Sequence, residues 1–164
     1  MLLVDSTTLN AVAMDNYSIK SYLELKVIWK DDDMFELKIT ATNGSFYGTT
    51  EVYETSDLLI AFAKSLLGYS NQDKALFHEA GKKNSISYFS MKFYSKNFSG
   101  DIGIEVNLEK SLFPPYREEE KDKLKLEIIV EPNAIDIFQK QLFTLATNEE
   151  GIARIYGKDV RLDN

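Results

Sequence analysis

The sequence predicts an α+β fold: a largely antiparallel sheet of six to seven strands, with two helices packed on one of its faces. Three observations support this prediction: apolar residues alternate with polar ones in several runs, two stretches have helical periodicity, and short turn signals separate the runs. The predicted order is βββ-α-ββββ-α. Because no linker rich in Gly, Ser or Pro divides the 164 residues, we expect a single domain over residues 1–164.

The first half of the chain carries the clearest pattern. Three runs alternate with a period of two, and Asp31-Asp32-Asp33 and Asn43-Gly44 are turn signals between them. The expected buried faces are Leu23, Leu25, Val27 and Trp29; then Phe35, Leu37, Ile39 and Ala41; then Phe46, Gly48, Thr50 and Val52. A helix should follow, capped by Thr55 or Ser56 and ending near Gly68, with an apolar stripe of Leu58, Leu59, Phe62, Ala63, Leu66 and Leu67.

The second half repeats strands and then a helix. Strands are expected near residues 75–79, 86–94, 102–108 and 124–130, followed by a helix capped by Asn133 and ending near Gly151. Residues 112–122 contain Pro114-Pro115 and a dense run of charge, so they predict an exposed charged loop. Residues 1–20 form an arm or an edge strand in this prediction, and residues 152–164 a short strand or a tail.

Composition narrows the classes of function. A net charge of −7, with no arginine before Arg117, argues against binding to nucleic acid or to an anionic membrane surface. No apolar run is long enough to span a bilayer, and cysteine is absent, which suits a reducing compartment. We therefore expect a cytoplasmic protein. The abundance of Lys, Asn, Ile and Tyr is typical of a bacterial source with a low GC content.

No motif indicates catalysis. His78 is the only histidine, and although Glu79 follows it, no serine or cysteine stands in a nucleophile context. Three adjacent aspartates at residues 31–33 lack the alternating spacing of a calcium loop. Glycine-rich nucleotide motifs are also missing. The prediction is a protein that is not an enzyme and that has no metal site and no cofactor.

The aromatic residues give the strongest functional hypothesis. Several tyrosines fall on strand faces opposite the apolar stripes, and an exposed group of them would suit protein recognition. The predicted binding residues are Tyr22, Lys26, Tyr47, Tyr53 and Tyr94. A second interpretation stays open, in which this face is covered by the N-terminal arm or by a partner subunit in a homodimer.

The leading functional hypothesis is a non-enzymatic protein with a protein-binding surface, of the kind found in inhibitors or toxin-immunity proteins. The acidic net charge would favour a basic protein partner through electrostatic steering. The alternative is a small apolar ligand held in a pocket between the sheet and the helix at residues 58–67.

Overall fold

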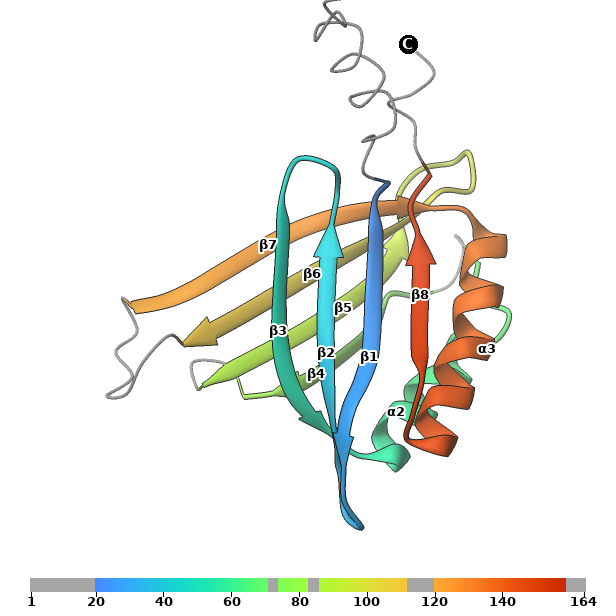
Figure 1. The fold of residues 1–164 in the computed structure, drawn as a ribbon. Coiled ribbons are helices and arrows are strands. Elements are labelled where there is room, and N and C mark those ends of the chain that lie inside the picture. The colour runs from blue at the N-terminus through green and yellow to red at the C-terminus, as the bar shows by residue number, and fades with distance from the viewer. Residues whose placement is uncertain (1–19, 71–73, 83–85, 112–119, 159–164) are drawn as a thin grey trace, which may run out of the picture.

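The structure, a computed structural model, describes residues 20–70, 74–82, 86–111 and 120–158. The fold is α+β, as predicted, but the strands form two antiparallel sheets of four strands each instead of one larger sheet. The first sheet has the order β3-β2-β1-β8 and the second β4-β5-β6-β7. Figure 1 shows the first sheet lying across the second, with both helices on the β8 side of the molecule.

The elements follow one another in the order βββ-α-ββββ-α-β. The strands are β1 (Tyr22–Lys30), β2 (Phe35–Thr42), β3 (Tyr47–Glu54), β4 (Leu76–Gly81), β5 (Ser87–Ser95), β6 (Ile102–Ser111), β7 (Lys121–Val130) and β8 (Ile152–Tyr156). The helices are α2 (Ser56–Ser65) and α3 (Pro132–Asn148).

The single predicted sheet is wrong for a physical reason. Alternation of apolar and polar residues shows which side chains face a core, but it does not show which strands pair. After α2 the chain enters the second layer, where β4 to β7 pair only with one another. It returns to the first sheet at the end, where β8 pairs antiparallel with β1 and Leu23 lies opposite Ile155. Residues 152–156 are therefore a strand. The two helices lie beside a pair of stacked sheets and do not cover one face of a single sheet.

One irregularity changes the face of a large side chain. In the β1–β2 pair, Val27 is opposite Leu37 but Trp29 is opposite Glu36, so Ile28 is an extra residue in a β-bulge. The bulge rotates Trp29 to the outer face of the sheet, where it is 46% exposed. The expectation that Trp29 lies with Leu23 in the core is therefore wrong. A strict period of two cannot reveal the inserted residue.

The helix ends also differ from prediction in detail. Thr55 is the N-cap residue of α2, but its hydroxyl makes no capping hydrogen bond. The Ser56 hydroxyl instead donates to the carbonyl oxygen of Ala146 on α3, at 2.8 Å, and so ties the two helices together. Glu131, and not Asn133, is the N-cap residue of α3, because Pro132 occupies the first turn. Leu58 and Leu67 of the expected stripe are exposed.

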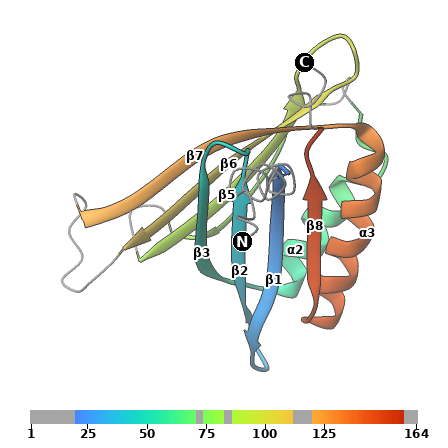
Figure 2. The same cartoon turned by 45° about the horizontal axis from the view of Figure 1, so that its top comes forward.

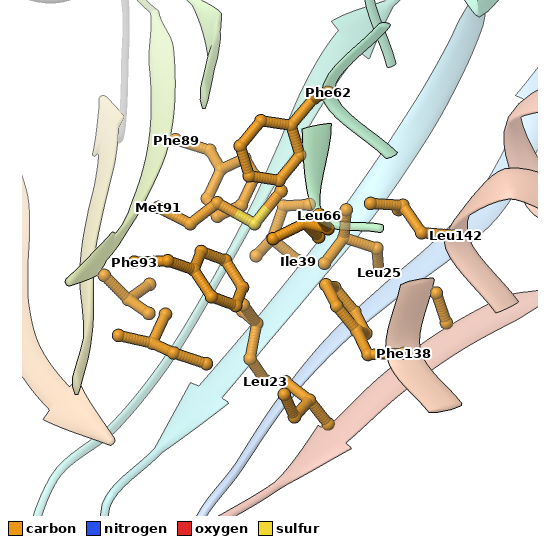
Figure 3. Close-up of a cluster of buried hydrophobic side chains, with 14 of the residues drawn as sticks. Leu23, Leu25, Ile39, Phe62, Leu66, Phe89, Met91, Phe93, Phe138 and Leu142 are labelled. Atoms are coloured by element: carbon orange, nitrogen blue, oxygen red, sulfur yellow. The ribbon is translucent and has the colours of Figure 1, made fainter. Parts of the chain in front are cut away.

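The core is continuous across both sheets and both helices. Its buried side chains include Leu23 and Leu25 of β1, Phe93 of β5, Phe62 of α2 and Phe138 of α3. Figure 3 shows these rings and aliphatic chains filling the space between the layers. The Phe93 ring lies 5.9 Å from the Phe62 ring and 6.3 Å from the Phe138 ring, centroid to centroid.

Two predicted segments lie partly outside the described residues. Residues 1–19 of the expected arm and residues 112–119 of the expected charged loop are not described. The last part of that loop is corrected, because β7 begins at Lys121 and the Lys121 side chain is buried. Within the described part of the chain, neither helix is long and apolar enough to cross a membrane.

Candidate functional site

The structure brings four of the five predicted binding residues onto one surface. Tyr22 and Lys26 of β1 and Tyr47 and Tyr53 of β3 all lie on the outer face of the first sheet, because they alternate with the buried residues of their strands. Tyr94 does not join them. It lies on β5 in the second sheet, where its ring packs over Gly103 and a Cβ at that glycine would come within 2.6 Å of it.

An aromatic pair marks the end of this face at the β1–β2 hairpin. The rings of Trp29 and Tyr53 meet edge to face with their centroids 6.1 Å apart, and Tyr53 is 57% exposed. Glu36 is the cross-strand neighbour of both. Ile28 and Met34 beside them are also exposed. We call the group Ile28, Trp29, Met34, Glu36 and Tyr53 the hairpin-end patch.

The acidic turn borders this patch. One carboxylate oxygen of Asp31 accepts hydrogen bonds from the backbone N–H groups of Asp33 (2.8 Å) and Met34 (2.9 Å). These bonds fix the turn, so the exposed residues Asp32 and Asp33 stay at the end of the hairpin whose first strand carries Trp29. Among the described residues, no group of three or more His, Asp or Glu side chains is arranged to hold a metal ion.

The opposite end of the face is occupied by its own interactions. The Arg154 guanidinium of β8 lies 5.3 Å from the centre of the Tyr22 ring and 5.7 Å from that of Tyr156. Its Nε donates to a carboxylate oxygen of Glu24 at 2.6 Å. Burial raises the pKa of the Tyr22 hydroxyl. Hydrogen bonds to Tyr156 and then to Glu24 raise the pKa of Arg154 above its usual value.

Between the two ends the face is locally basic. Lys26 and Lys38 are cross-strand neighbours in the middle of the sheet, and both are exposed. Glu51 follows on β3 and forms an ion pair with Lys110 of β6, at 3.1 Å. On the described part of this face, the carboxylates outside these ion pairs are Glu36 in the hairpin-end patch and Asp32 and Asp33 at the adjoining turn, and the middle of the face has a different charge.

The single histidine is part of the interior. His78 Nε2 lies 2.7 Å from Glu54 Oε2, and both side chains are almost fully buried, at 8% and 2% exposure. The second oxygen of Glu54 accepts from the backbone N–H of Thr55 at 3.0 Å, and the imidazole ring packs on Phe62 with centroids 5.1 Å apart. This pair links β3 of the first sheet to β4 of the second. Its geometry suits a structural contact between layers more than contact with a substrate.

Two hollows bordered by described residues open at the surface. One of about 380 Å³ runs beside β3, and one of about 300 Å³ lies between α3 and β8. The space between the sheets and helices is filled by core side chains such as Phe62, Phe93 and Phe138 (Figure 3).

Sequence reasoning did not select Trp29, Glu36 or Arg154 as binding residues of this outer face. Trp29 was hidden by the bulge, and Arg154 lies in a strand that was expected only as an alternative to a tail. Glu36 had a visible signal, since it alternates with Phe35 and Leu37. No family model, no curated protein and no solved structure matches this chain.

Proposed function

We propose that this chain is a non-enzymatic protein that binds a basic protein partner through the hairpin-end patch, as an inhibitor or a toxin-immunity protein would. The observation that carries the proposal is the exposed Trp29–Tyr53 pair, held edge to face beside carboxylates. Tryptophan and tyrosine are enriched among the residues that dominate binding energy at protein interfaces. Both are presented on strands, so a partner would meet them with little loss of side-chain entropy.

Charge supports a basic partner. Glu36 lies next to both rings, and Asp32 and Asp33 are exposed at the adjoining turn. These carboxylates near an aromatic centre would steer a basic surface to the patch and would raise the association rate at low salt. The net charge of −7 acts in the same direction over a longer range.

The non-enzymatic part of the proposal draws on the His78–Glu54 pair. The only imidazole in the sequence is buried in a contact between the two layers. A general base must reach the proton of its substrate, directly or through one water molecule. A buried histidine already engaged with a carboxylate is poorly placed for that task.

Affinity capture from extracts of the source cell tests the proposal. The full chain, its Trp29→Ala variant and a Leu58→Ala control would each be immobilised, and the captured protein would then be purified for titration. Leu58 is a suitable control because it is a large exposed apolar residue on α2, outside the patch. We expect one stoichiometric partner with a basic surface, and Trp29→Ala should weaken its binding by about thirtyfold, as for a central interface residue.

Two further measurements separate the parts of the proposal. Neutralising Asp32 and Asp33 as asparagines should slow association and reduce its dependence on salt, while dissociation stays nearly constant. For the inhibitory part, the purified partner should lose its activity when the chain is added. Absence of a stoichiometric partner, or equal binding by wild type and Trp29→Ala, would contradict the proposal.

A further inference from the structure

The four edges of the two sheets are protected to very different degrees. On β7, the exposed residues Lys123 and Lys125 occupy alternate positions along the edge, and edge lysines oppose pairing with another strand. On β8, the backbone N–H of Arg154 donates to the side chain of Gln141 on α3, at 2.8 Å, so a helix covers that edge. The third edge, β4, is only six residues long. The fourth edge, β3, has neither lysine nor proline over its eight residues.

The pairing register shows which backbone groups β3 presents at this edge. Asn43 and Phe46 are joined by a backbone hydrogen bond of 3.2 Å, so Gly48 and Thr50 form the next hydrogen-bonded pairs with β2. The N–H and C=O groups of the alternate residues point away from β2; these residues are Tyr47, Thr49, Glu51 and Tyr53. Among the described residues, no backbone hydrogen bond is seen at the outward side of Tyr47 or Thr49. Within the part of the chain that the structure describes, this edge is therefore open for pairing.

A groove runs along the open edge. The second sheet continues past β3, as Figures 1 and 2 both show for β6 and β7. Its inner face forms a floor from Leu124 of β7 with Asp122 beside it, and Tyr47 and Thr49 form the wall. Leu108 of β6 lies beneath this floor and is almost fully buried. The groove has a volume of about 380 Å³. Lys110 crosses the edge lower down to reach Glu51, and its side chain is 45% exposed, so it can swing aside.

We propose that β3 is a strand-addition site for an extended peptide segment of a partner protein. The peptide would pair with the outward backbone groups of Tyr47 and Thr49 and lay an apolar side chain on Leu124. Its other side chains would lie beside the outer-face row of β3 at Tyr47 and Glu51. This row favours lysine or arginine and aromatic groups on the peptide.

A second copy of the chain fits this edge poorly. Antiparallel pairing of β3 with β3 of another copy would place a two-fold axis perpendicular to the joined sheet. Both second sheets would then lie on the same side. Because β6 and β7 already project beneath the open edge (Figure 1), each copy would occupy the space that the other second sheet needs. A single extended strand avoids this collision.

Selection from a displayed library of random peptides, with the full chain as bait, tests the inference. Thr49→Pro removes the outward N–H and leaves the bonds to β2 intact, because proline is tolerated on edge strands. Thr49→Ala is the matched control that keeps the N–H. We expect selected peptides to bind wild type and Thr49→Ala alike and to bind Thr49→Pro about tenfold more weakly, through the lost hydrogen bond and disturbed pairing.

Amide hydrogen exchange gives a test that does not depend on the folding of Thr49→Pro. In the free protein, the amide of Thr49 should exchange much faster than those of Gly48 and Thr50, and a selected peptide should protect it. The inference is overturned if no peptide is selected, if Thr49 is as protected as Gly48 before peptide is added, or if the peptides leave Thr49 unprotected. A dimer that Thr49→Pro abolishes would also overturn it.

The strand-addition site stands on different residues from the hairpin-end patch, and the two can fail separately. Trp29→Ala should leave the affinity of the selected peptides unchanged, because Trp29 is at the far end of the sheet from the groove. If Trp29→Ala abolishes partner capture while Thr49→Pro leaves peptide binding unchanged, that result would support the proposed function and contradict the strand-addition site.

Discussion

Removing the Glu54 carboxylate should strongly destabilise the protein. Glu54 lies at 2.7 Å from His78 Nε2 and at 3.0 Å from the backbone nitrogen of Thr55, and its side chain is only 2% exposed. Each hydrogen bond to a charged group contributes about 1.5–3 kcal/mol. Truncation would also leave a buried imidazole without its partner, so we expect Glu54→Ala to lower the free energy of unfolding by about 3–5 kcal/mol.

Urea unfolding at neutral pH measures this loss, and two variants bracket it. Glu54→Gln keeps the shape of the side chain and its ability to bond both partners, so it should recover most of the stability. Glu51→Ala on the same strand removes an exposed ion pair with Lys110 and should cost no more than about 1 kcal/mol. If Glu54→Ala costs no more than Glu51→Ala, the pair does not hold the layers together, and its burial needs a different explanation.

Three further predictions concern the fold. Burial and the hydrogen bond to Glu79 raise the pKa of Tyr88 to about 12. The stabilising effect of the neutral hydroxyl should therefore be complete below about pH 10 and be lost between about pH 10 and 12. Urea unfolding across this range should show the difference in unfolding free energy between wild type and Tyr88→Phe shrinking by about 2–3 kcal/mol. Phe138→Ala should cost about 3–5 kcal/mol in the same assay, because the ring is fully buried, and a loss below about 1 kcal/mol would contradict this packing. The single tryptophan, Trp29, should be quenched readily by acrylamide, and deleting Ile28 should leave that quenching unchanged; strong protection in the wild type would contradict the bulge.

The sequence predicted well which face of each strand is buried, but it predicted poorly which strands pair with one another. Leu23, Leu25, Leu37 and Ile39 are fully buried as expected, because each strand has one face in a core and local alternation records it. Which strands pair depends on the path of the chain after α2, and no local pattern encodes that path. Both layers bury apolar faces, so a sheet of eight strands and two sheets of four produce the same alternation.

The candidate site was predicted in part for a related reason. Tyr22, Lys26, Tyr47 and Tyr53 share a face because alternation and register agree along β1 and β3. Tyr94 has the same local pattern but belongs to the other layer, so only the tertiary structure separates it. Placing Trp29 on this face requires the bulge at Ile28. There β1 has one additional residue, while β2 continues its regular alternation opposite it.

The hairpin-end patch and the strand-addition site meet on β3, and this arrangement has a consequence for any single partner. Tyr53 lies at one end of the strand and Tyr47 at the other, six residues away, so about 20 Å separates them at the rise of an extended strand. A partner that docks a basic surface on the patch would bring a neighbouring segment within reach of the open edge. Binding at both places would make the second contact intramolecular and strengthen the complex without new chemistry. If one partner uses both, the losses caused by Trp29→Ala and Thr49→Pro should add on the free-energy scale, because the two positions share no neighbours.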